Sequence, residues 1–286
     1  MLLYFLITMT QLMDYELQEI QMIKELLQKD SLKNFDNLKG IEKISLVESL
    51  ISSKSKKKNS LNILPILRVK EIKEYFPKNQ NFCEVIESAC NPLKVSEILF
   101  NSYELKNELF IPGVIINPLP DLEILKSLKY SFASKNLVTV IQWPIIDFIQ
   151  IGIGDAIILN IKQIESSNLD ILELIDEAHS YSQEVVLQVY DEDDLEIALQ
   201  SEGDVIVVPF NSYNYDHQIK NTNQTSHHAI NYRNFLIEHL NSREIEREIV
   251  FSCSSIADLK QLISMKLTFS YSCAISFNDL FNSNTN

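Results

Sequence analysis

Three short runs rich in β-branched residues, separated by amphipathic segments, constrain the fold of this chain more than any other feature. The runs cover residues 156–159, 185–189 and 205–208. The segments between them carry apolar residues at helical spacing, as in 171–179. Strands that alternate with helices are typical of a parallel sheet covered by helices. The pattern therefore predicts an α/β fold.

The same alternation extends over the rest of the chain from residue 61 onward. Further strands are predicted at 63–69, 110–116 (interrupted by Pro112), 137–141, 249–252 and 269–274, and 95–100 is either a strand or a helix. Helices are predicted at 81–89, 121–130, 145–151, 235–247 and 257–265. Seven or eight strands, each followed by a helix, indicate a (β/α)8 TIM barrel. An open doubly wound sheet is the alternative, although such a sheet normally begins with a glycine-rich turn.

The first sixty residues predict a separate helical extension. Residues 12–28 have the apolar spacing of an amphipathic helix, and a second short helix is expected at 41–51. Residues 52–60 are polar, basic and rich in serine, which predicts a loop or linker. We therefore expect an N-terminal helical extension and linker over 1–60 and a barrel over 61–286.

The apolar residues 1–8 are too few to span a membrane, and no basic segment precedes them. They predict a buried N-terminal segment, with a weak targeting signal as the alternative. The expected location is the cytoplasm, and targeting to an organelle is the alternative.

Charge and glycine content argue against several classes of ligand. The 286 residues include 25 basic and 39 acidic side chains, a net charge of −14, which disfavours nucleic acid as a partner. Only 5 residues are glycine and no phosphate-binding glycine motif occurs, so no nucleotide cofactor is expected. No CxxC or HExxH spacing occurs, and the acidic run 191–194 is interpreted as a helix N-terminus rather than a metal site. We expect no metal.

In its strand and helix motifs the chain resembles indole-3-glycerol-phosphate synthase, the barrel of tryptophan biosynthesis. Residues 154–159 (GDAIIL) are similar to the family's GADAILL, and 184–199 (EVVLQVYDEDDLEIAL) to its LEVLVEVHDEEELERAL. Residues 251–256 (FSCSSI) take the place of VSESGI, and 63–70 (ILPILRVK) that of the strand ending IAEIK. The resemblance covers most of the chain and is most specific over 154–200.

The family closes an indole ring by decarboxylating and dehydrating a phosphorylated anilino-deoxyribulose. The resemblance implies Lys70 as the general acid and Ser254 as a substrate contact. A surface or salt-bridging role for Lys70, and a strand-end cap for Ser254, are the alternatives. Gln188 stands where the family has a glutamate, Cys253 replaces a second glutamate, and Ser255 replaces the phosphate-binding glycine.

Other departures lie at the third and sixth strand ends. No lysine lies between Lys135 and Lys162, where the family has its third-strand lysine, and Trp143 falls near that place. The family's Asn-Asn-Arg ending is Pro-Phe-Asn at 209–211. Each lost acid or base costs a typical enzyme about 10²–10⁴-fold in rate.

Two functions are therefore weighed. The first is a carbon–carbon lyase, a decarboxylase of tryptophan biosynthesis that binds a phosphorylated small molecule. The second is a non-catalytic pseudoenzyme that serves as a scaffold or as the partner subunit of a pathway protein. Neither requires a cofactor, nucleic acid or a membrane.

Overall fold

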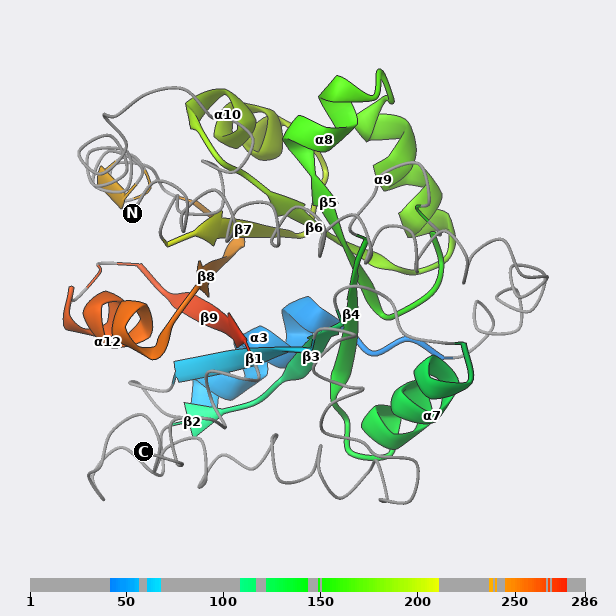
Figure 1. Ribbon diagram of the computed structural model, residues 1–286, viewed down its shortest axis with the longest axis horizontal. Helices are drawn as coiled ribbons and strands as arrows, with labels where there is room; N and C mark the ends of the chain where they lie inside the picture. The colour runs from blue at the N-terminus through cyan, green and yellow to red at the C-terminus, as the bar shows by residue number, and fades with distance from the viewer. Residues whose placement is uncertain are drawn as a thin grey trace, which may run out of the picture.

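The computed structural model describes residues 42–56, 61–67, 109–116, 122–143, 149, 151–210, 237–238, 240, 245–265, 267 and 269–276. They form a closed barrel of parallel strands with helices between them (Figure 1). The strands follow the order β2-β1-β3-β4-β5-β6-β7-β8-β9, and pairing of β1 with β9 closes the barrel. The (β/α)8 prediction is confirmed. The open doubly wound sheet is excluded because its end strands would remain unpaired.

Eight barrel strands arise from nine segments because proline interrupts one of them. The segments are β1 Leu61–Leu67, β2 Leu109–Phe110, β3 Gly113–Ile116, β4 Val138–Gln142, β5 Ala156–Asn160, β6 Glu184–Gln188, β7 Val205–Pro209, β8 Glu248–Cys253 and β9 Tyr271–Ser276. Both β2 and β3 pair with β1, so they form one strand that is broken at Pro112, as predicted. Proline causes the break because it has no N–H for the ladder.

Five described helices lie between strands outside the barrel (Figure 1). They are α7 Leu122–Ala133, α8 Ile161–Ser166, α9 Ile171–Ser180, α10 Glu192–Gln200 and α12 Ile256–Ser264. A polar side chain just before the helix caps each of the last four, namely Asn160, Asp170, Asp191 and Ser255. Such caps bind N–H groups that have no partner inside the helix.

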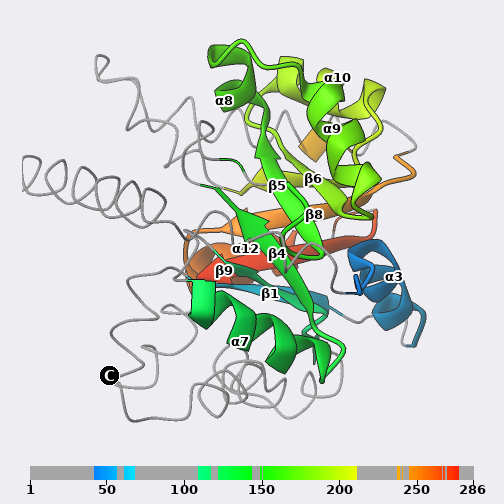
Figure 2. The same cartoon turned by 90° about the vertical axis from the view of Figure 1, so that its right-hand side faces the viewer.

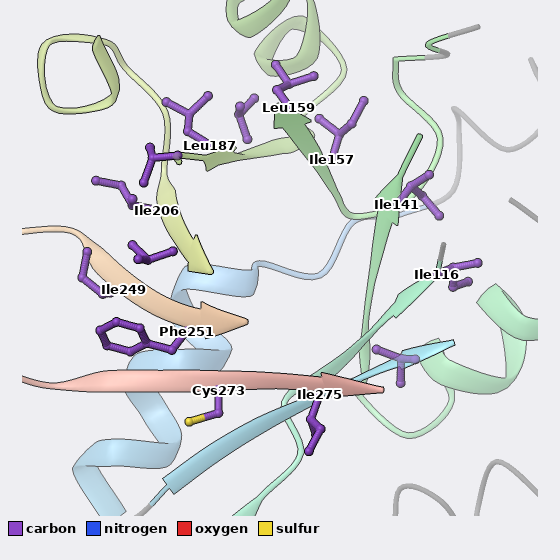
Figure 3. Packing of buried hydrophobic residues seen from close by; sticks show 14 of the residues in the cluster. Ile116, Ile141, Ile157, Leu159, Leu187, Ile206, Ile249, Phe251, Cys273 and Ile275 are labelled. Carbon is purple, nitrogen blue, oxygen red and sulfur yellow. The ribbon is translucent and has the colours of Figure 1, made fainter. Parts of the chain in front are cut away.

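A large apolar core lies between the strands and these helices. Figure 3 shows its side chains on the outer side of the barrel, among them Leu159, Leu187 and Phe251. Residues at alternate positions along each strand point to opposite faces, so every barrel strand contributes to two cores. This explains why the strands read as nearly continuous apolar runs rather than as alternating ones.

A second apolar core fills the barrel itself. Its strand residues include Leu64, Ile115, Val140, Ile158, Val186, Val207, Val250 and Ala274. Helix α3, Leu46–Lys56, adds Leu46 and Leu50 to this core. Figure 2 shows α3 on the side where β4 and β5 begin, opposite their arrowheads. The helix therefore covers the N-terminal end of the barrel.

Several predicted boundaries differ from the structure. Helix α3 begins at Leu46 rather than at 41 and continues to Lys56, so the first part of the predicted linker is helical. Burial of Leu46 and Leu50 against the barrel explains the shift. The helix predicted at 235–247 ends earlier than expected. It is helical at residues 237, 238 and 240 but not at 245–247, and β8 begins at Glu248. Ile151 lies in a turn rather than in a helix. None of the helices in the described ranges could cross a membrane.

Candidate functional site

The C-terminal ends of the barrel strands form the candidate site because (β/α)8 barrels carry their chemistry there. Four inner-core residues are each followed, two positions later, by the last inward-facing residue of the same strand. These last residues are Ile66 after Leu64, Gln142 after Val140, Gln188 after Val186 and Ser252 after Val250. Side chains two positions apart share one face of a strand. On these four strands the inner core therefore ends in two amides, a hydroxyl and an isoleucine, which we call the mouth layer.

The two amides of the mouth layer are hydrogen-bonded to each other. Gln142 Nε2 donates to Gln188 Oε1 over 3.1 Å. Gln142 ends β4 and Gln188 ends β6, so the bond reaches across β5 inside the barrel. Gln188 is only 8% exposed. The Gln188 side chain is thus held by a neutral partner.

Asn160 and Tyr190 extend this polar surface beyond β5 and β6. Asn160 Nδ2 donates to the Tyr190 hydroxyl oxygen over 3.3 Å, while Asn160 Oδ1 accepts from the backbone N–H of Gln163. Asn160 therefore both caps α8 and positions the hydroxyl group of Tyr190. These groups can donate and accept hydrogen bonds without carrying a charge.

Ser254 lies just after β8, where its hydroxyl contacts a helix of the same chain. Ser254 Oγ donates to Asp258 Oδ2 over 2.5 Å, and the same carboxylate oxygen accepts from the backbone N–H of Ser254. Ser255 caps α12 by accepting from the N–H of Asp258 over 3.1 Å. These contacts give Ser254 a partner on α12.

The junction between β6 and α10 repeats this arrangement with acidic residues. Asp191 Oδ1 accepts from the backbone N–H of Asp194, and Asp194 Oδ2 accepts from the N–H of Tyr190 over 2.8 Å. Lys162 Nζ lies 2.8 Å from Asp191 Oδ2 and 3.3 Å from Asp194 Oδ1. The acidic run therefore serves as a helix N-terminus, as predicted. Burial raises the pKa of Asp194, and Lys162 opposes the rise.

Lys70 and its neighbour Arg68 lie outside the described residues. Trp143, which follows β4, is buried, and its Nε1 has no hydrogen-bond partner within the described part of the chain. The described ranges contain no group of three or more histidine, cysteine, aspartate or glutamate side chains that could hold a metal ion.

A charged cluster that the sequence did not reveal lies at the other end of the barrel. Lys43 Nζ donates to the carbonyl oxygens of Gly152 and Gly154, each over 2.6 Å. Lys129 is 2% exposed, and its Nζ lies 3.5 Å from Asp155 Oδ1. Burial lowers the pKa of Lys43 to about 7, Lys129 acts in the same direction, and Asp155 opposes it.

Glu184, at the start of β6, completes this cluster. Its carboxylate accepts from the Ser45 hydroxyl over 2.6 Å and from the backbone N–H groups of Leu46 and Val47. A barrel residue therefore caps α3. Burial raises the pKa of Glu184, while these hydrogen bonds oppose the rise. Because it lies at the N-terminal end of the barrel, the cluster is structural rather than part of the candidate site.

The mouth layer could have been found from one sequence signal. The strands VTVIQ and EVVLQ both end an apolar run with glutamine, and these are Gln142 and Gln188. A polar residue that ends a buried strand lies at the barrel mouth if the fold is a barrel.

Comparisons with known proteins leave the family open. No protein-family model matches the chain, and no curated protein does. A solved structure of a variant of the citrate synthase SbnG superposes with a TM-score of 0.42 and 11% identity, over 79% of this chain and 90% of that one. At that distance the likeness carries no argument about function.

Proposed function

We propose that this chain is a non-catalytic (β/α)8 barrel of the indole-3-glycerol-phosphate synthase type, serving as a scaffold or partner subunit in its pathway. The order of the strands is compatible with this proposal. The segments that carry the strongest resemblance form β5 and β6, which are neighbours, and the segment 251–256 spans the end of β8.

The hydrogen bond between Gln142 and Gln188 carries the proposal. An amide exchanges no proton at neutral pH, so Gln188 cannot act as the acid or base that a glutamate would supply. Its acceptor oxygen is already engaged by Gln142. Gln188 therefore has the shape of the glutamate found in the family that the chain resembles, but it cannot exchange a proton. It makes a structural hydrogen bond with Gln142 instead.

The contacts of Ser254 support the same reading. Its hydroxyl donates a hydrogen bond to Asp258, which lies in the first turn of the capped helix α12. A hydroxyl engaged in this way stabilises a strand–helix junction. The cap role that the sequence allowed for this serine is therefore favoured over a substrate contact.

Indole fluorescence tests the proposal directly. The purified chain is incubated with the phosphorylated anilino-deoxyribulose, and formation of the indole product is followed over time. We expect the same rate as in buffer, for the wild type and for the Lys70→Ala variant alike. Turnover by the wild type that disappears in Lys70→Ala would establish the enzyme instead. A Lys260→Ala variant, altered at an exposed lysine of α12, controls for nonspecific loss.

A further inference from the structure

Two lysine side chains lie beside one carboxylate at the N-terminal end of the barrel, opposite the candidate site. Lys129, on α7, is buried, and its Nζ lies 3.5 Å from Asp155 Oδ1. Lys43 Nζ donates to the carbonyl oxygen of Gly154, the residue just before Asp155. Both oxygens of Asp155 also accept from backbone N–H groups, over 3.2 Å and 2.7 Å. One carboxylate balances only one ammonium group, so the cluster favours a neutral amine on one of the two lysines.

Lys43 is the lysine whose contacts suit the neutral form. Its Nζ donates two hydrogen bonds, to the carbonyl oxygens of Gly152 and Gly154, each over 2.6 Å. A neutral amine has two N–H groups for these acceptors and keeps its lone pair. Burial, followed by the positive charge of Lys129, lowers the pKa of Lys43 to about 7, while Asp155 opposes the change. A large fraction of Lys43 is therefore unprotonated near neutral pH.

The two amines also differ in exposure and in hydrogen bonding. Lys43 is half-buried, so part of its side chain is open to solvent. Lys129 Nζ is buried and has no hydrogen-bond partner among the described residues. An unprotonated lysine amine next to another cation is a good nucleophile, and a buried ammonium group is stabilised by an acceptor placed beside it. A group that is attached to Lys43 and carries an acceptor oxygen would suit both lysines.

We propose that Lys43 is a modification site for small acyl phosphates, which transfer their acyl group to its Nζ. The nitrogen lone pair attacks the acyl carbon, and a C–N bond forms. The bond between the acyl carbon and the phosphate oxygen breaks, phosphate leaves with the bonding electrons, and one amine proton passes to water. A small donor suits a half-buried amine, and the neutral amide product leaves Lys129 and Asp155 as a balanced pair. The inference goes beyond the proposed function and does not depend on it.

The groups around Lys43 can accommodate the amide. Its nitrogen keeps one N–H, which can still donate to the carbonyl oxygen of Gly152. The carbonyl oxygen of Gly154 also accepts from Gln183 Nε2 over 3.4 Å, so it keeps a donor after the reaction. The new amide oxygen is an acceptor for the ammonium group of Lys129. Acylation therefore leaves no buried acceptor of the cluster without a donor.

The pH profile of acylation tests the inference on the full-length chain. The protein is treated briefly with acetyl phosphate at pH 7, 8 and 9.5, unfolded, and labelled at its remaining amines with isotopically heavy acetic anhydride. Mass spectrometry then gives the extent of reaction at each lysine. At pH 7 Lys43 should react at least about threefold faster than Lys260, the exposed lysine of α12. Between pH 8 and 9.5 its rate should change less than about twofold, whereas the ordinary lysine pKa of about 10.4 predicts a rise of about thirtyfold for an exposed lysine.

A variant of the neighbouring cation tests the part assigned to Lys129. Lys129→Met should raise the pKa of Lys43, so acylation at pH 7 should fall at least about threefold and increase with pH. Lys135→Met, at an exposed lysine just after α7, makes the same change in net charge and should leave the rate at Lys43 within about twofold. Circular dichroism shows whether both variants are folded.

The wild-type profile decides the inference even if Lys129→Met does not fold. An unmodified Lys43, or a rate at Lys43 that equals that at Lys260 and rises with pH in parallel, would overturn it. In a folded Lys129→Met variant, an unchanged rate at pH 7 would also contradict it, because the neighbouring ammonium group would then have no effect on the amine.

Discussion

Ser182 adopts a left-handed backbone conformation immediately after α9. Its φ is +54°, and its N–H donates to the carbonyl of His179, while the next N–H, of Gln183, reaches Ala178. This pair of bonds is the Schellman ending of a helix, in which glycine is preferred because it has no Cβ. Ser182→Gly should therefore raise the free energy of unfolding by about 0.5–1 kcal/mol, measured by urea denaturation.

The same replacement two residues earlier provides the control. Ser180 is the last helical residue of α9 and is exposed, as is Ser182. Ser180→Gly should lower stability by about 0.5–1 kcal/mol because glycine is unfavourable in a helix. Equal changes in the two variants would mean that the left-handed conformation does not determine the effect.

Single residues also show where prediction from sequence succeeds and fails. The replacement of an acid by Gln188 is visible in the sequence, but its bond to Gln142 is not, because the two residues lie on strands separated by a third. The helix N-terminus at the acidic run 191–194 is visible in local spacing, and this prediction is confirmed. Contacts within a few residues can be inferred from sequence, whereas those set by barrel closure require the fold.

At the scale of elements, α3 is joined to the barrel by partly buried charges. Lys43, just before the helix, bonds to Gly152 and Gly154, and Glu184 caps the helix from β6. Lys43 and Gly152 are 109 positions apart in the chain. The apolar spacing of a helix shows which face is buried but not what it packs against, so the sequence could predict a helix here but not its place at the barrel end.

The lowered pKa of Lys43 predicts a pH dependence of stability. Between pH 7 and 10.5 the unfolded chain holds a proton on this amine that the folded chain has released, so the stability rises with pH across this window. Lys43→Met should remove this rise, as measured by urea denaturation at steps from pH 7 to 9.5. Lys260→Met, at an exposed lysine, should keep the wild-type slope.

Glu184 affects stability with the opposite dependence on pH, and it does so over a different pH range. Its pKa is raised in the folded chain, so its contribution to stability is full below the ordinary value of 4.5 and is lost as the pH rises through the raised pKa. The alkaline measurement therefore isolates Lys43. A slope that persists in Lys43→Met between pH 7 and 9.5 would assign the effect to another group.

For the whole molecule, the periodicity of the sequence determined the architecture because every barrel strand is buried on both faces. The runs that β5, β6 and β7 contribute are apolar at nearly every position, as parallel strands covered by helices must be. The periodicity does not show which residues of a strand point into the barrel and which point outward. The structure divides these residues between a core inside the barrel and one outside it.

These two cores should unfold together, although the strands separate them. Leu50 on α3 is fully buried in the inner core, whereas Trp143 lies in the outer core. Leu50→Ala should lower the free energy of unfolding by about 2–5 kcal/mol. Because each strand serves both cores, Trp143 fluorescence and far-ultraviolet circular dichroism should shift to the same lower urea midpoint.

The matched control is the next residue on the same helix. Ile51 is 51% exposed, so Ile51→Ala should cost less than about 1 kcal/mol. If Leu50→Ala shifted the dichroism but left the Trp143 transition unchanged, α3 would unfold separately from the barrel. Equal shifts of the two urea midpoints would instead establish that α3, a helix of the predicted N-terminal extension, unfolds together with the barrel. The reason is that its leucines complete the inner core at the N-terminal end of the strands.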